Sequence, residues 1–162
     1  MAENETPGVV RQFLIRTIYL KDVSFETPNS PEIFRKDWKP ESQLQFDIKV
    51  KPLGEDTYEV VLALTVTSKL EEQTAYLIEV HQAGIVTIQG LEEAELEPLF
   101  YVYCPGLLYP YAREAANNLV AKGGFPQLVL QHVNFDQIYA QKLAERDKQQ
   151  VATPPPPPET TH

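Results

Sequence analysis

The stretch DTYEVVLALTVTSKLEEQTAYLIEVHQAGIVTIQ, residues 56–89, indicates the fold of this chain. It is typical of two long strands joined by a short turn near residues 69–72. Side chains at every second position of a strand share one face of the sheet. In the first strand that face carries Tyr58, Val60, Leu62, Leu64 and Val66. In the second strand one face carries Tyr76, Ile78 and Val80, and the other carries Ala75, Leu77, Glu79 and His81.

The second face of this hairpin is less polar than a solvent-facing sheet normally is. In the first strand it begins with Glu59 but continues with small or β-branched residues, namely Val61, Ala63, Thr65 and Thr67. A sheet with one wet face alternates cleanly between apolar and polar positions. We therefore expect both faces to cover something. The predicted helices suffice for one face only, so the other face is expected to meet another subunit or a client polypeptide.

Two further strands precede the hairpin. Residues 9–20 and 44–50 each alternate in the way that a strand requires. Between them, residues 21–42 contain Pro28, Pro31 and Pro40, and proline lacks the donor that a central strand needs. The segment also carries aromatic side chains, so it is expected to be a long, ordered crossover loop. The sequence thus predicts a four-stranded, mainly antiparallel sheet.

After Gly90 the apolar residues no longer recur at every second position, and helices are expected from there onward. Residues 92–97 predict an acidic helical turn that Pro98 interrupts, and Pro105 with Gly106 is expected to break the chain again. A helix then follows, ended by glycines 123–124, with a stripe of Leu108, Ala112, Ala115 and Leu119. After an extended linker over residues 125–130, Asn134 is expected to cap a last helix, with a stripe of Phe135, Ile138, Tyr139 and Leu143.

The 162 residues fit one domain with one core. Residues 1–8 are polar and are expected to be a flexible N-terminus, and residues 9–148 form the predicted domain. Residues 149–162 are of low complexity, with five prolines at 154–158, and are expected to be a disordered tail with polyproline II character.

Charge and cysteine content narrow the classes of partner and compartment. The net charge of -9 disfavours nucleic acid and anionic membranes, and favours a basic protein partner. The single cysteine, Cys104, allows no internal disulfide, which fits a reducing compartment. The sequence shows no secretory signal and no run of 18 apolar residues. We therefore expect a cytoplasmic protein without direct membrane insertion.

Catalytic motifs are not recognisable. The sequence has no Gly-rich phosphate loop and no GxSxG, and the histidines at 81, 132 and 162 have no HExxH-type spacing. We therefore expect no enzyme activity and assign no catalytic residue, metal or cofactor. Cys104 is interpreted as buried structure. A small-molecule-binding or catalytic domain that uses Cys104 and His81 is kept as an alternative.

Four segments in the same order carry a family resemblance. KDVSFETPNSPEIFRKDWKPE (21–41), YEVVLALTVT (58–67), TAYLIEV (74–80) and YCPGLLYPYAREAANNLVAKGGFPQLVLQHVNFDQIY (103–139) resemble SecB, the bacterial protein-export chaperone family. The resemblance is collinear over residues 9–147. It implies an α+β fold, with a four-stranded antiparallel sheet and C-terminal helices packed on one face, assembled as a homotetramer, a dimer of dimers.

The resemblance also implies a function. SecB-like proteins are ATP-independent cytosolic holdases that bind unfolded precursor proteins, keep them translocation-competent and deliver them to the SecA ATPase. A SecB-like chaperone dedicated to one client, such as an antitoxin, is the alternative within the same fold. The proline-rich tail could also recruit a partner by polyproline docking.

Site residues are carried over position by position as what the resemblance implies. The SecA-binding positions match Asp22, Glu26, Leu77 and Glu79. The client-binding positions match Phe34, Trp38, Leu44, Phe135 and Tyr139. The subunit-interface positions match Ile78, Val80 and Gln82. Ordinary surface charge is the plain alternative for the acids, and core packing is the alternative for Phe34 and Trp38. The hairpin turn departs from the family pattern, because Leu70 and Glu71 stand where a glycine is common.

Overall fold

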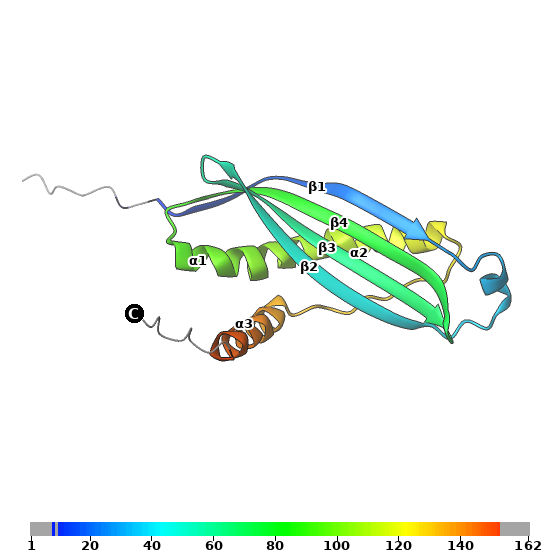
Figure 1. The fold of residues 1–162 in the computed structure, drawn as a ribbon. Helices are drawn as coiled ribbons and strands as arrows, with labels where there is room; N and C mark the ends of the chain where they lie inside the picture. Colours follow the sequence, from blue (N-terminus) through cyan, green and yellow to red (C-terminus); the bar gives the residue numbers. More distant parts are fainter. Residues whose placement is uncertain (1–7, 9, 153–162) are drawn as a thin grey trace, which may run out of the picture.

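The computed structural model describes residue 8 and residues 10–152 (Figure 1). The predicted flexible N-terminus, apart from Gly8, and the tail from residue 153 lie outside these described residues. The elements follow one another along the chain as β1 (Gln12–Glu26), a 3₁₀ turn (Glu32–Arg35), β2 (Glu41–Gly54), β3 (Thr57–Leu70), β4 (Gln73–Gln89), α1 (Glu93–Pro98), a π-helical turn (Leu99–Tyr103), α2 (Cys104–Lys122) and α3 (Phe135–Val151).

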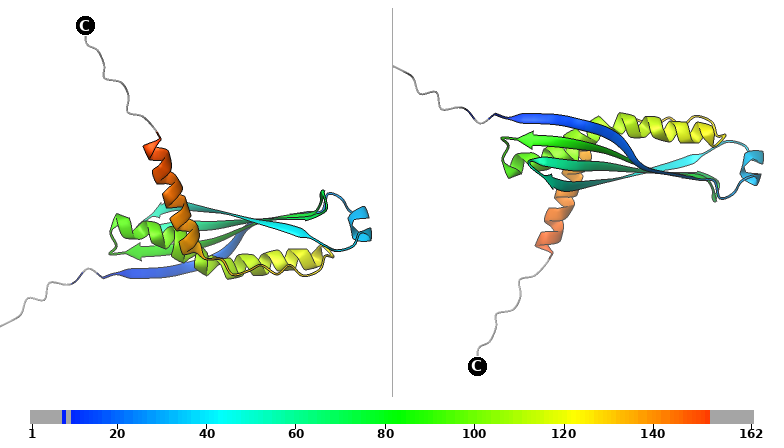
Figure 2. Two further views of the ribbon diagram at one scale, coloured as in Figure 1. Left: turned by 90° about the horizontal axis from the view of Figure 1, so that it is seen from below. Right: turned by 90° about the horizontal axis from the view of Figure 1, so that it is seen from above.

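The predicted four-stranded antiparallel sheet is confirmed, with strand order β1-β4-β3-β2. β3 and β4 form the central hairpin, and the crossover carries the chain from the β1 edge to the β2 edge. Helix α2 lies along one face of the sheet and leaves the other face uncovered (Figures 1 and 2). We call the uncovered side the open face and the other side the helix face.

Strand β1 is longer than expected, because it ends at Glu26 and shortens the crossover to residues 27–40. Two register shifts, between Ile15 and Thr17 and between Leu20 and Asp22, interrupt its pairing with β4. Each bulge inserts a residue and resets which side chains point to which face. A single alternating pattern therefore could not follow the strand past residue 20.

The core lies between the helix face and α2. Val60, Leu62, Leu64 and Val66 of β3 are all 0% exposed, as the period-two pattern predicted. Helix α2 covers them with a buried stripe spaced four residues apart, Leu108, Ala112, Ala116 and Val120. The predicted stripe was therefore wrong in its second half, since Ala115 and Leu119 are only partly buried.

The expected break at Pro105 and Gly106 was wrong, because residues 93–122 are helical throughout. The π-helical turn explains the continuity. Cys104 N–H bonds to the carbonyl of Leu99, five residues back, just before Pro105. A π turn shifts the bonding register, and a proline in the first turn of a helix loses no bond that it needs. Pro110 lies inside α2 and is exposed.

The last helix begins as predicted. The side chain of Asn134 accepts a hydrogen bond from the backbone N–H of Gln137 at 3.2 Å, which is an N-cap. Gly124 ends the preceding segment with φ of +80°. Helix α3 runs to Val151, so it extends into the region expected to be a disordered tail from residue 149. In Figure 2, α3 crosses the β2 edge and projects toward the side of the open face.

Candidate protein-binding surfaces

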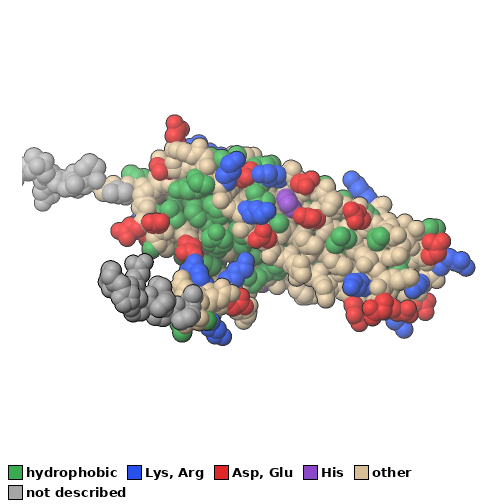
Figure 3. Space-filling view, viewed as in Figure 1, with side chains coloured by type: hydrophobic (Ala, Val, Ile, Leu, Met, Phe, Trp, Pro, Cys, Tyr) green, Lys and Arg blue, Asp and Glu red, His purple; other side chains and the backbone are tan. Residues whose placement is uncertain are grey.

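The open face brings together the four residues matched to SecA binding. Glu26 of β1 lies opposite Leu77 of β4, and the register places Asp22 and Glu79 on the same face two to four residues away. The three acids are exposed and Leu77 is half-buried. We call Asp22, Glu26, Leu77 and Glu79 the acidic patch. Acidic and basic side chains are interspersed over the middle of this face (Figure 3).

A histidine adjoins the acidic patch. His81 Nε2 lies 2.6 Å from Glu79 Oε1. An ionised carboxylate can only accept, so the imidazole N–H donates. His81 lies directly opposite Asp22 on β1 and Ala63 on β3.

A second charged group fixes β1 against β3 farther along the open face. Glu59 accepts from the Tyr19 hydroxyl and also from Lys21 Nζ, the latter at 2.7 Å. The hydrogen bond from Lys21 is the largest cause that lowers the pKa of Glu59, followed by the bond from Tyr19. Burial, with the neighbouring Glu59 carboxylate, raises the pKa of Tyr19 to about 12. This group ties Lys21 to Glu59 and away from the acidic patch.

The open face is hollowed next to His81. A depression of about 180 Å³ is lined by His81 and Glu79 of β4, by small residues of β3 and by polar residues of β2. Ala63 and Thr65 form its floor, because short side chains on the middle strand leave space between the longer ones on either side. Asp47 and Lys49 form its β2 rim.

The crossover and the linker after α2 meet in an aromatic cluster at the end of the sheet near the β3–β4 turn. Phe125 of the linker is the hub, with Phe34 stacked on it at 4.7 Å between ring centroids, Trp38 at 5.5 Å and Tyr76 at 5.0 Å. Phe34 is 49% exposed, whereas Phe125 is 7% exposed. The matched positions Phe34 and Trp38 thus come together, with Phe34 at the surface and Trp38 half-buried.

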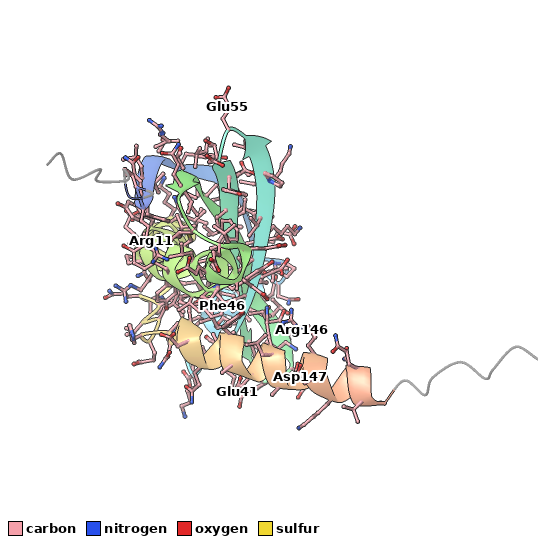
Figure 4. The ribbon with its side chains drawn as sticks, turned by 90° about the vertical axis from the view of Figure 1, so that its left-hand side faces the viewer. Arg11, Glu41, Phe46, Glu55, Arg146 and Asp147 are labelled. Carbon is pink, nitrogen blue, oxygen red and sulfur yellow. The ribbon has the colours of Figure 1, made fainter. Side chains whose placement is uncertain are left out.

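The start of α3 makes a second aromatic cluster, on the β2 edge. Phe135 contacts the rings of Phe46 and Tyr109 edge-on, at 5.6 Å and 6.0 Å. Figure 4 shows Phe46 above the first half of α3. Phe135 is only 5% exposed, so in this conformation its ring anchors the helix and offers little surface to a client. Leu44, two residues before Phe46 on β2, is half-buried on the same face and lies between the two clusters.

The next turns of α3 rest on α1 and the π-helical turn. Tyr139 stacks on Tyr101 with planes 2° apart, and Arg146 Nη1 lies 3.1 Å from Glu97 Oε1. Burial, with the nearby Glu97 carboxylate, raises the pKa of Tyr139. A hollow of about 170 Å³ lies between these side chains. Tyr139 is half-buried beside this hollow.

Phe46, Tyr109 and Phe125 were missed at the level of the sequence. The alternation of β2 places Phe46 on the same face as Leu44, so that pattern could have found it. Phe125 and Tyr109 belong to the clusters only through tertiary contacts, for which the sequence carries no local signal.

The residues matched to the subunit interface lie on the helix face. Ile78 and Val80 are 0% exposed and are enclosed by the core of this chain. Gln82 is 4% exposed, and its side-chain amide donates to the carbonyl of Tyr19 at 3.0 Å. The chain itself therefore accounts for their burial, and an effect on assembly through them has to be transmitted by neighbouring residues.

Apolar side chains on the edge strand β1 remain exposed. Leu14, Ile15, Leu20 and Val23 are 37–49% exposed. Tyr103 and Tyr111, on the helical segment, are 50% and 51% exposed. These exposed apolar side chains lie on β1 and the helical segment, so the expectation that the second face of the central hairpin meets another subunit or a client stays a prediction.

Cys104 and His81 do not form a pair, which contradicts the catalytic alternative that used both. Cys104 is the first residue of α2 and lies against Ile18 and Gly84 on the helix face, whereas His81 lies on the open face. Burial raises the pKa of the Cys104 thiol to about 12, so it is not a ready nucleophile.

Among the described residues, no helix is both long and apolar enough to cross a membrane.

Comparison with known proteins gives one consistent family. The family model described as "Preprotein translocase subunit SecB" matches residues 5–146. The "Protein-export protein SecB" of Methylococcus capsulatus is 52% identical over 153 residues, covering 94% of this chain and 97% of that protein. The protein of the same name from Halorhodospira halophila is 47% identical over 156 residues, covering 91% of this chain and 90% of the relative.

A solved structure shares the fold. It is a SecB-like chaperone of Mycobacterium tuberculosis in complex with a peptide from the HigA1 antitoxin, with a TM-score of 0.63 and 20% identity. The match covers 75% of this chain and 91% of that one. Together with the family match and the two relatives, the fold and motifs show that this chain belongs to the SecB family of protein-export chaperones.

Proposed function

We propose that this chain is an ATP-independent holdase of the cytoplasm, which binds unfolded precursor proteins and delivers them to the SecA ATPase. One observation carries the proposal. A line of aromatic and aliphatic side chains follows the β2 edge on the helix face, from the Phe125 cluster through Leu44 to Phe46, while the acidic patch occupies the open face. This arrangement supports the proposal that client and SecA use separate surfaces of one sheet.

The aromatic line suits an unfolded chain. Rings give large contact areas at low rotamer cost and do not read a particular sequence. Each client side chain buried on them contributes about 1.5–3 kcal/mol. Several such contacts along one client act together, because the second contact forms at a high effective concentration. Phe34, Trp38, Leu44 and Tyr139 are proposed to contact the client directly, and Phe135 is proposed to hold α3 beside this aromatic line.

The acidic patch suits a basic partner. Exposed carboxylates on a rigid sheet accelerate association with a positively charged surface, and the effect weakens as salt is added. We propose that Asp22, Glu26 and Glu79 supply this attraction and that Leu77, half-buried among them, supplies apolar contact.

The exposed residues of β1 support assembly into a homotetramer, a dimer of dimers. Exposed apolar patches on a monomer mark interaction surfaces, and β1 exposes Leu14, Ile15, Leu20 and Val23. Ile78, Val80 and Gln82 are proposed to influence assembly through the neighbouring β1, with which they pair. Light scattering on the purified chain is expected to give the mass of four 18.4 kDa subunits. A monomeric mass would contradict this assembly.

Two measurements test the function: suppression of client aggregation and binding to SecA. Purified protein is expected to suppress the aggregation of several unrelated, chemically denatured precursors without ATP. Glu79→Lys is expected to weaken SecA binding while the tetramer persists. Glu114→Lys makes the same charge change at an exposed position of α2. It is the matched control and is expected to bind SecA normally. An unaltered titration for Glu79→Lys would reject the acidic patch as the docking site.

The alternative is a chaperone dedicated to one client. The fold neighbour from Mycobacterium tuberculosis was solved with an antitoxin peptide, which favours this reading, but its 20% identity shows the fold alone. The relatives near 50% identity are export proteins by name, and they favour the general function. Holding of only one precursor in a broad panel would reverse this preference.

A further inference from the structure

His81 adjoins the acidic patch without belonging to it. Its imidazole N–H donates to Glu79 Oε1 at 2.6 Å, and the two side chains lie two residues apart on the same face of β4. The His81 side chain is 25% exposed and that of Glu79 is 50% exposed. The histidine is therefore the better fixed of the two, and its hydrogen bond restricts where the carboxylate can point.

Charged groups from the other strands surround His81. Asp22 lies opposite it on β1, and β3 contributes the uncharged Ala63. Across the depression, β2 contributes Asp47 and Lys49. Lys21, which precedes Asp22 on β1, is bound to Glu59.

The charge state of His81 changes what the acidic patch offers. With a neutral imidazole, Glu79 is held by one N–H, and its second oxygen stays available to a basic group of the partner. With an imidazolium, the same contact becomes a charge-assisted hydrogen bond. The cation then offsets one of the three negative charges of the patch and competes with the partner for Glu79. Histidine is the side chain whose charge ordinarily changes between about pH 5 and 8.

We propose that His81 is a positioning residue of the SecA-docking surface: it orients the Glu79 carboxylate, and its protonation weakens docking. This inference rests on the proposed function of the acidic patch. It adds to that function a residue outside the patch and a dependence of delivery on pH.

The test uses the full chain and purified SecA, with affinity titrated from about pH 8 to about pH 6 at constant ionic strength. His81→Gln keeps an N–H donor but cannot be protonated. It is expected to bind SecA like the wild type at the upper pH. On acidification, the fold-loss of SecA affinity is expected to be about five times smaller for this variant than for the wild type. His81→Ala removes the donor and is expected to bind about twofold more weakly at the upper pH.

Titration of groups on SecA is common to all variants, so the comparison between variants isolates His81. Glu79→Gln is expected to reduce the difference between His81 and His81→Gln, because the carboxylate that contacts the imidazolium is gone and only the charges of Asp22 and Glu26 still sense it. Circular dichroism and light scattering check that each variant is folded and assembled. Equal pH dependence in the wild type and His81→Gln would overturn this inference alone. A wild-type chain that binds no SecA at any pH would reject the docking assignment, and the inference with it.

Discussion

The ring of Phe34 stacks on that of Phe125, with centroids 4.7 Å apart and planes inclined by 26°. The contact joins the crossover to the linker after α2, two segments that are far apart in the sequence. One partner is 49% exposed and the other 7% exposed. The two rings of one contact therefore have separable roles, one at the surface and one in the core.

Phe34→Ala is expected to reduce client holding while changing the free energy of unfolding by only about 1 kcal/mol, because half of the ring is already in water. Phe125→Ala is expected to destabilise the chain by about 3–5 kcal/mol, because it removes the hub of a buried cluster. Urea unfolding and a light-scattering assay of client aggregation separate the two effects. Leu53→Ala, at an exposed apolar residue near the β2–β3 turn, is the control and is expected to change neither.

The sheet could be predicted from the sequence because its signal is local. Alternation in residues 58–66 gave the buried face of β3 directly, and the turn before Gln73 was recognisable between two alternating runs. The sequence-based expectation failed where the backbone departs from the regular repeat of a strand or an α-helix. The bulges of β1 shift its alternation, and the π-helical turn lets one helical segment pass Pro105. Neither feature has a strong local signature.

The candidate sites could be predicted in part, through the family resemblance. The strand register then brought Asp22, Glu26, Leu77 and Glu79 together, as that resemblance implied. The hydrogen bond between His81 and Glu79 and the aromatic contacts of Phe125 depend on tertiary positions. Periodicity alone could not supply them.

The hairpin turn offers a stabilising substitution. Glu71 has φ of +55°, the left-handed region that costs an ordinary residue about 1–2 kcal/mol and costs glycine almost nothing. Its ion pair with Lys36, at 3.6 Å, is exposed and contributes little. Glu71→Gly is therefore expected to raise the free energy of unfolding by about 0.5–1 kcal/mol, measured by urea denaturation.

Glu72→Gly is the matched control for this turn, since residue 72 has no positive φ. Glycine there only adds freedom to the unfolded chain, so the variant is expected to be slightly less stable than the wild type. Equal effects of the two substitutions would show that backbone strain at Glu71 does not limit stability.

Burial of Cys104 predicts a loss of stability in alkali. The pKa of the thiol is raised from 9.0 to about 12 by burial, so between these values the folded chain holds a proton that the unfolded chain has lost. The free energy of unfolding therefore falls as pH rises above 9. Cys104→Ala is expected to show a smaller fall than the wild type over this range. The native thiol is also expected to resist a disulfide reagent at about pH 8 until the chain is unfolded.

The N-cap of α3 predicts a local effect. Asn134 accepts from the backbone N–H of Gln137, and contacts of Phe135, Tyr139 and Arg146 help to fix this helix to the body of the chain. Asn134→Ala removes the acceptor and is expected to destabilise α3 by about 1 kcal/mol. Amide hydrogen exchange is then expected to quicken in residues 135–151 and not in β3 or β4, because opening of α3 leaves the core intact.

Asn134→Asp keeps a side-chain oxygen at the cap and places a negative charge at the helix N-terminus, where it is favourable. It is expected to preserve wild-type exchange in α3. The same pair of variants connects the helix to the proposed function, because Tyr139, proposed to contact the client, keeps its place against Tyr101 only while α3 is docked. Client holding is expected to fall for Asn134→Ala and to persist for Asn134→Asp. Faster exchange in α3 with unchanged holding would remove Tyr139 from the proposed client-binding residues and leave Phe34, Trp38 and Leu44.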